Sequence, residues 1–256
     1  QVQGKGRLIS ALGDLYQGEF SRSLYHGVGR HIKFRGEDYS GNFENGKRSG
    51  YGILRKPNGD SYEGEFIEDL FEGKGTWIFS GNKYEGEFKN GKRHGQGNQT
   101  WAMGLKYKGE WKEDFLDGEG ELWYNNRQMY KGSFKKGKRN GKGIYVNQDE
   151  AEGFRYEGDW VDGDMQGYGC LTLFQIGTYE GDFKKNLRHG KGKMVWLENY
   201  VYEGDWENNK RQGFGKLTLS DGDTYQGQFR DELYDGNGEY RWAQSERLFN
   251  GKFLRN

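Results

Sequence analysis

Aromatic residues and glycines alternate with polar residues in a short pattern that recurs along most of the chain. Written from its tyrosine, the unit is Tyr-x-Gly-x-(Phe or Trp), six residues, Gly-x-Gly and a variable segment, as in residues 84–88 and 95–97. Strand side chains alternate between two faces, so the tyrosine, the first glycine and the second aromatic residue share one face. The pattern predicts strands with one aromatic, glycine-rich face and one mostly charged face.

The residues between the two halves of a unit predict a hairpin. Asn90-Gly91 is the strongest short hairpin signal, and Gly-x-Gly then begins the return strand. We expect both glycines of each pair, such as Gly50 and Gly52, to lie on one face. Glycine weakens a strand unless another group must approach its backbone closely. We therefore expect the glycines to make room for aromatic rings of the neighbouring strand.

The unit has a nearly fixed period. Its tyrosines follow one another at steps of 22 or 23 residues, except for one longer step. They are Tyr16, Tyr39, Tyr62, Tyr84, Tyr107, Tyr130, Tyr156, Tyr179, Tyr202 and Tyr225. Such a period indicates a repeat architecture. We predict an all-β fold, an elongated, twisted single antiparallel sheet of consecutive hairpins, because long open sheets must twist.

The array is predicted to cover residues 1–256 as one domain, with ten full repeats and half repeats at both ends. Gly4-Lys5-Gly6 resembles the second half of a unit, and residues 249–253 resemble a first half. We therefore expect the chain to be cut from a longer array. The long step, after Tyr130, carries three additional residues within 147–155, which we expect to form a solvated acidic loop.

The composition of the chain limits the classes of partner that it can bind. Aromatic residues make up 16% of the chain, which argues against disorder, and the formal net charge of zero argues against nucleic acid as a partner. The single Cys170 excludes an intramolecular disulfide and favours a reducing, intracellular compartment. We expect a cytoplasmic protein with no nucleic-acid partner.

No group of residues converges in sequence as a catalytic or metal site. His26, His94 and His189 occupy the same position in their units, so they lie apart along the array and cannot share a metal ion. The Gly-x-Gly pairs lack the strand-to-helix context of a nucleotide-binding loop. We predict no enzyme activity, no cofactor and no metal.

The motif Tyr-x-Gly-x-(Phe or Trp) followed by Gly-x-Gly resembles the MORN (membrane occupation and recognition nexus) repeat family. The resemblance implies an elongated antiparallel sheet, and a scaffold that binds helical or extended partner segments in a groove. It also implies a role in a cytoskeletal or ciliary assembly such as an axoneme, with cytoskeletal or axonemal protein partners, and a homodimer as a further option. The alternative that it leaves open is a peripheral membrane tether that binds anionic phosphoinositides.

The predicted partner-binding groove uses aromatic residues from the middle of the array. They are Tyr62, Phe66, Trp77, Tyr84, Phe88, Trp101, Tyr107, Trp111 and Tyr124. Packing within the sheet alone is an equally open interpretation for each of them.

The predicted hairpin tips are of two kinds. Basic tips carry Lys92-Arg93 or Lys138-Arg139, and apolar, acidic tips carry Leu70-Phe71 or Phe115-Leu116. In one interpretation neighbouring tips pair electrostatically and the apolar residues fill gaps. In the other the apolar pairs form an exposed edge for a partner. The recurring Lys-Arg tips suit anionic lipid, although acidic tips interrupt them.

Overall fold

The computed structural model of the chain describes residues 1–254. These residues form 22 strands and contain no helix. They divide into two compact units, of which the first ends at Gln128 and the second begins at Met129.

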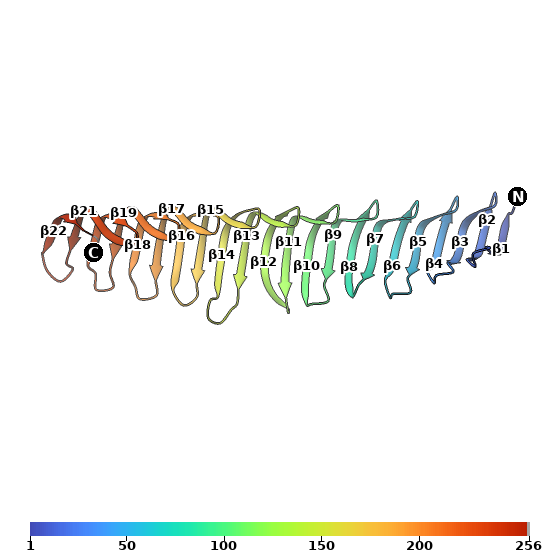
Figure 1. Cartoon of the computed structure of the whole chain (residues 1–256), viewed down its shortest axis with the longest axis horizontal. Coiled ribbons are helices and arrows are strands. Elements are labelled where there is room, and N and C mark those ends of the chain that lie inside the picture. The colour runs from blue at the N-terminus through green and yellow to red at the C-terminus, as the bar shows by residue number, and fades with distance from the viewer. Residues whose placement is uncertain (255–256) are drawn as a thin grey trace. The chain divides into compact units, whose positions relative to one another are not determined.

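In the first unit every strand pairs antiparallel with the next strand along the chain (Figure 1). Its strands are β1 (Gly4–Ile9), β2 (Leu15–Ser21), β3 (Leu24–Ile32), β4 (Asp38–Glu44), β5 (Lys47–Arg55), β6 (Ser61–Ile67), β7 (Leu70–Phe79), β8 (Asn82–Lys89), β9 (Lys92–Thr100), β10 (Leu105–Lys112) and β11 (Phe115–Tyr124).

The second unit follows the same rule of antiparallel neighbours. Its strands are β12 (Arg127–Lys135), β13 (Lys138–Asn147), β14 (Phe154–Val161), β15 (Asp164–Leu173), β16 (Gly177–Lys184), β17 (Leu187–Trp196), β18 (Val201–Glu207), β19 (Lys210–Thr218), β20 (Thr224–Arg230), β21 (Leu233–Arg241) and β22 (Leu248–Phe253). The predicted all-β antiparallel hairpin array is confirmed. The assignment of residues 1–256 to one domain stays a prediction.

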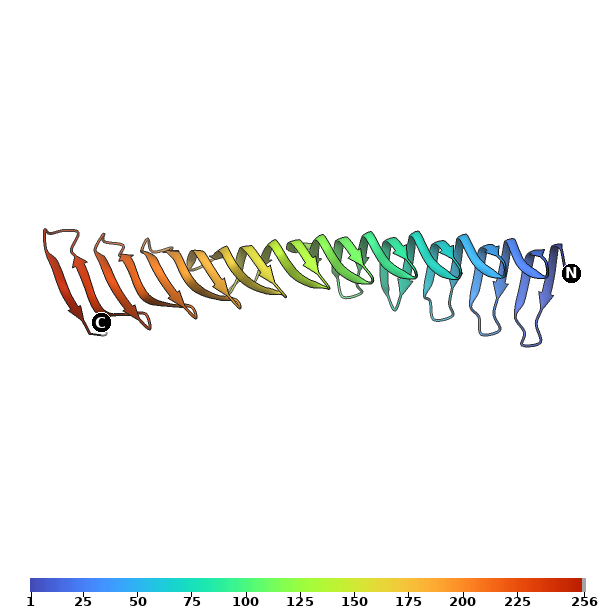
Figure 2. The same cartoon turned by 90° about the horizontal axis from the view of Figure 1, so that it is seen from above.

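The strand that opens each repeat bends at its central glycine. In β6 the ring centroids of Tyr62 and Phe66 lie 5.0 Å apart. In a straight strand, positions i and i+4 lie roughly 13 Å apart. The strand therefore folds toward the face that carries both rings, which gives the strands of the first unit their curved outline in Figure 2. We call this face the inner face and the opposite one the outer face.

The aromatic core forms where each tyrosine ring crosses a pair of glycines. Gly64 and Gly75 are register partners on β6 and β7. A Cβ atom at Gly75 would lie 2.5 Å from Oη of Tyr62, so the ring of β6 covers the bare backbone of its neighbouring strand. The expected role of the glycines is confirmed. The sequence did not show that the Tyr62 hydroxyl also donates a hydrogen bond to the backbone carbonyl of Glu65 at 3.0 Å.

The prediction that both glycines of a Gly-x-Gly pair share a face was wrong. Gly52 lies against the ring of Tyr39, whereas Gly50 has a φ of +63°. A Cβ atom at Gly50 would lie 3.3 Å from Nδ2 of Asn42, which belongs to the outer face. The cause is a β-bulge between β4 and β5, where the register shifts between Gly41 and Phe43. The left-handed conformation at the bulge turns Gly50 outward.

The hairpin turns are shorter than the predicted tips. Between β6 and β7 only Glu68 and Asp69 form the turn, both with positive φ (48° and 70°), as a type I′ turn requires. The residues predicted as tips instead begin the strands that follow such turns. They are Leu70 and Phe71 in β7, Lys92 and Arg93 in β9, Phe115 and Leu116 in β11, and Lys138 and Arg139 in β13. The predicted acidic insertion does form a loop, between β13 and β14.

Candidate functional site

Most of the residues predicted to line a groove are core residues. Tyr62, Phe66, Tyr84, Phe88, Tyr107 and Trp111 are each at most 3% exposed. They are buried because the bend at each glycine folds the rings against one another. Their burial favours the interpretation that these six residues pack within the sheet, and that they line a partner-binding groove stays a prediction. Trp77 and Trp101 are half-buried, and Tyr124 is 46% exposed.

A second row of inner-face side chains lies directly opposite the second aromatic residue of each repeat. All members of this row, which we call the inner strip, are half-buried. In the first unit they are Tyr25, Arg48, Phe71, Arg93 and Leu116. In the second unit they are Arg139, Met165, Arg188, Arg211 and Tyr234.

The inner strip packs on the aromatic core. The ring of Phe71 stacks on Tyr62, with centroids 3.7 Å apart and an interplanar angle of 4°. The guanidinium carbon of Arg93 lies 4.3 Å from the ring centroid of Trp111, within the range of a cation–π contact. Each member of the strip therefore has one side fixed by the core and another side that faces solvent.

Neighbouring hairpins are linked by ion pairs between an arginine of the strip and the next turn. Nε of Arg48 lies 2.9 Å from Oδ1 of Asp69, and Nε of Arg93 lies 2.9 Å from Oδ1 of Asp114. An outer link accompanies the first pair, with Nζ of Lys47 3.4 Å from Oε2 of Glu68. The interpretation that neighbouring tips pair electrostatically is confirmed for the hairpins that carry Arg48 and Arg93.

The predicted apolar edge does not form as one surface. Leu70 is 47% exposed and Phe115 is 53% exposed, whereas Phe71 and Leu116 turn to the inner strip. The pairs separate because consecutive residues of a strand point to opposite faces. The exposed positions on the two faces are therefore two different candidate surfaces.

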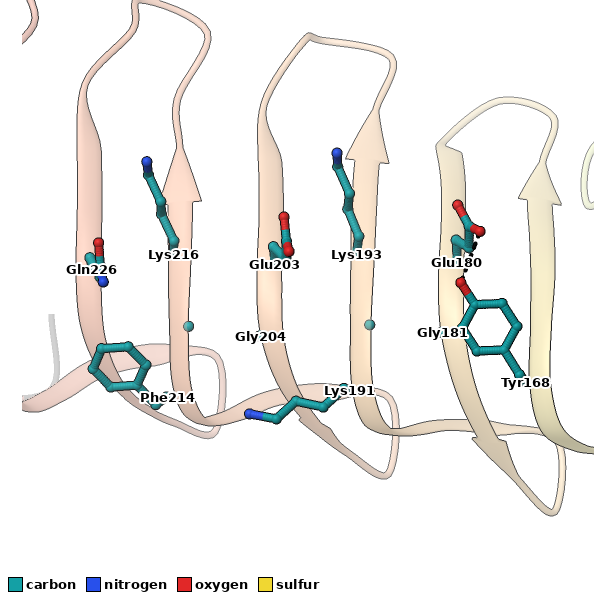
Figure 3. Close-up of a pocket in the computed structure, with 12 residues that line it drawn as sticks. Tyr168, Glu180, Gly181, Lys191, Lys193, Glu203, Gly204, Phe214, Lys216 and Gln226 are labelled. Carbon is teal, nitrogen blue, oxygen red and sulfur yellow. Dashed lines mark hydrogen bonds between the residues drawn. The ribbon is translucent and has the colours of Figure 1, made fainter.

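The outer face of the second unit carries a shallow channel (Figure 3). Its floor is the backbone of the paired glycines Gly181, Gly192, Gly204 and Gly215, whose Cβ positions face the tyrosine rings of the inner face. Figure 3 shows Lys193, Glu203 and Lys216 along one side, and Tyr168, Lys191 and Phe214 along the other. The charges alternate in sign, so the channel has no strong preference for either sign of ligand.

The described residues offer few groups suited to metal binding or nucleophilic catalysis. Residues 1–254 contain no group of three or more His, Cys, Asp or Glu residues placed to hold a metal ion. Burial raises the pKa of the Cys170 thiol, so the nucleophilic thiolate is disfavoured at neutral pH. No helix long and apolar enough to cross a membrane occurs in the same residues.

A comparison with family models finds MORN repeats in ten stretches, each beginning at one of the predicted repeat tyrosines. They are residues 16–33, 39–61, 62–82, 84–106, 107–129, 130–150, 156–173, 179–196, 202–224 and 225–247. The chain belongs to the MORN repeat family. The repeat is of a non-enzymatic type, and its presence indicates a protein-binding or membrane-binding scaffold. A comparison with curated proteins finds no match.

The MORN signature and the inner strip have different roles in this structure. The signature tyrosines, glycines and second aromatic residues form the buried hairpin core. The inner strip lies outside the signature, and its side chains vary from Arg to Met, Leu, Phe and Tyr. The signature residues thus provide a constant framework, whereas the side chains of the inner strip vary from repeat to repeat.

Proposed function

We propose that this MORN repeat chain is a non-enzymatic scaffold that binds helical or extended segments of protein partners along its inner strip. Its partners would be cytoskeletal or axonemal proteins. It would be located in the cytoplasm, on a cytoskeletal or ciliary structure. The family resemblance alone supports this location. The observation that carries the binding proposal is the half-buried row of apolar and arginine side chains on a packed aromatic core.

The geometry of the strip suits recognition of a long segment. Successive members within a unit are two strands apart, which is roughly 10 Å. Stacking and ion pairs already fix their side chains, so these side chains lose little conformational entropy when a partner binds. Arginine and aromatic residues also dominate the binding energy of protein interfaces. A partner with side chains at the same interval would contact several members at once.

The alternative, a peripheral membrane tether, is favoured by the exposed Lys92 and Lys138 at the starts of β9 and β13. Two other lysines in this position, Lys47 and Lys210, are paired with Glu68 and Asp231. Sedimentation with phosphoinositide vesicles at physiological salt tests the tether. Recovery of the protein in the supernatant would remove it.

Paired variants on the same two strands test the scaffold proposal. Phe71→Ala with Leu116→Ala changes the inner strip, whereas Leu70→Ala with Phe115→Ala removes apolar side chains from the opposite face. After circular dichroism shows that both proteins are folded, proximity labelling in ciliated cells compares their neighbours. We expect cytoskeletal or axonemal proteins to be lost only with the inner-strip variant. Equal labelling by both variants would contradict the proposal.

A further inference from the structure

The arginines of the inner strip differ in whether the next turn supplies a carboxylate. The second residue of that turn always donates its backbone N–H to the carbonyl of the strip residue, as Asp69 does to Arg48 at 3.1 Å and Asn209 to Arg188 at 3.0 Å. Its side chain is therefore placed beside the guanidinium. Three arginines meet an acid there, namely Arg48 with Asp69, Arg93 with Asp114 and Arg211 with Glu232.

Arg139 and Arg188, both in the second unit, are the exceptions. The residue beside Arg139 is Gly163, which has no side chain, and Nη2 of the arginine donates to the Gly163 carbonyl at 2.9 Å. The residue beside Arg188 is the neutral Asn209, whose backbone carbonyl accepts from Nη2 at 3.0 Å. Within residues 1–254, neither guanidinium forms an ion pair.

Both arginines are held in place without a counter-charge. Their guanidinium carbons lie 4.1 Å from the ring centroid of Trp160 and 4.5 Å from that of Trp206. Burial lowers the pKa of Arg139 and of Arg188, yet a guanidinium stays protonated at neutral pH.

The carboxylates that act on these two arginines form hydrogen bonds or ion pairs with other residues. Asp164, which acts on Arg139, accepts a hydrogen bond from Asn186 at 2.5 Å. Glu232, which acts on Arg188, is 2.7 Å from Nε of Arg211. Among the residues that the structure describes, neither guanidinium therefore has a carboxylate bound directly to it.

We propose that the inner strip of the second unit binds an acidic segment of a protein partner, with one carboxylate at Arg139, another at Arg188 and an apolar side chain at Met165 between them. This inference rests on the proposed scaffold function and specifies the chemistry of the partner. The two arginines are four strands apart, roughly 19 Å. On a partner helix, with its rise of about 1.5 Å per residue and about 3.6 residues per turn, two carboxylates on one face at this separation would be about 14 residues apart.

The occupant follows from charge complementarity. A half-buried guanidinium gains most from a carboxylate, which accepts two parallel hydrogen bonds in the plane of the guanidinium. Met165 presents a flexible apolar side chain that adapts to its neighbour. The arginines of the strip in the first unit have internal carboxylates, so that strip offers an acidic segment no such gain.

A labelled helical peptide of leucine and glutamate, with two glutamates about 14 residues apart on its leucine face, serves as the probe. Its control carries glutamine in place of every glutamate. Binding to the full chain is measured by fluorescence anisotropy at low and physiological salt. We expect the glutamate peptide to bind at least about fivefold more tightly than the glutamine peptide, and the difference to shrink as salt rises.

Asn209→Asp is the decisive variant, because it gives Arg188 a carboxylate with almost no change of shape. We expect it to weaken binding of the glutamate peptide by roughly fivefold. The matched control, Asn208→Asp, adds the same charge at the other residue of the turn, away from the guanidinium, and should change the affinity less than about twofold. Asp is accepted at the position of Asn209, since Asp69 and Asp114 occupy it in other hairpins.

Equal effects of Asn209→Asp and Asn208→Asp, or equal binding of the two peptides, would overturn the inference. So would vesicles of phosphatidylcholine with 5% phosphatidylinositol bisphosphate that bind in an Asn209-dependent way while the peptide does not, because the ligand would then be a lipid headgroup. These outcomes concern only charge in the second unit. The scaffold proposal fails separately, if the Phe71 and Leu116 variant keeps all of its partners.

Discussion

Replacing Gly75 by alanine tests the packing of ring on backbone that every repeat uses. The new Cβ atom would lie 2.5 Å from Oη and 2.7 Å from ring carbons of Tyr62. The ring has nowhere to retreat, because Phe71 stacks on it at 3.7 Å and Phe66 and Phe88 meet it edge-on at 5.0 and 5.2 Å. The hairpin must therefore open or the tyrosine must leave its site.

The magnitude follows from two opposing effects. Overpacking of a filled core costs about 1–3 kcal/mol, and a contact this short with an immobile ring belongs at the upper end. Alanine also restricts the unfolded chain, which stabilises the fold by about 0.4–1 kcal/mol. We expect a net loss of about 2 kcal/mol in the free energy of unfolding. For a chain of this length the melting temperature should fall by about 4–8 °C.

The matched control is Gly6→Ala. Gly6 is the second glycine of its own Gly-x-Gly pair, but its nearest neighbour would be a ring carbon of Phe20 at 3.2 Å. We expect a change within about 0.5 kcal/mol. Thermal unfolding of both variants, with hydrogen exchange of β6 and β7 to detect local opening, measures the difference. A Gly75 variant as stable and as protected as the Gly6 variant would refute the argument.

Two further predictions concern the tyrosine hydroxyls. Tyr156→Phe removes the hydrogen bond that the hydroxyl donates to the Asp159 carbonyl at 3.0 Å. We expect the free energy of unfolding, measured in urea, to fall by about 1 kcal/mol. Unchanged stability would mean that this hydrogen bond contributes nothing. Burial raises the pKa of Tyr39 to about 12, whereas an unfolded tyrosine ionises at about 10. The resulting stability should be complete below about pH 10 and be lost as pH rises toward 12. Tyrosinate absorbance at 295 nm should then appear at higher pH in the native protein than in the protein unfolded in urea. Titration curves that coincide would contradict the burial of Tyr39.

The fold was largely predictable because the same hairpin-forming pattern occurs in ten repeats. The period, the alternation around Tyr62 and turn residues such as Asn90-Gly91 together define consecutive antiparallel hairpins. The bulge was not predictable, because alternation places Gly50 and Gly52 on one face, and only the positive φ of Gly50 reverses it. The short turns were missed because Glu68-Asp69 lacks the asparagine and glycine that favour type I′ turns.

The candidate site was less predictable than the fold, since it depends on contacts between repeats. A flat strand would leave Phe88 and Trp111 accessible, and only the bend at glycine buries them. The ion pair of Arg48 and Asp69 joins residues 21 positions apart, so it appears only once the register of neighbouring hairpins is known. The lack of a carboxylate at Arg188 follows from the same spacing, which places Asn209 beside it.

The central claim is that partners bind the inner strip rather than the outer face, and hydroxyl-radical footprinting of a captured partner complex tests it most directly. Neighbouring residues of one strand serve as internal references, since Phe71 and Leu116 face inward whereas Leu70 and Phe115 face outward. We predict that the partner protects Phe71 and Leu116 from oxidation and leaves Leu70 and Phe115 as reactive as in the free protein. Protection of Leu70 and Phe115 alone would contradict the claim and assign binding to the outer face.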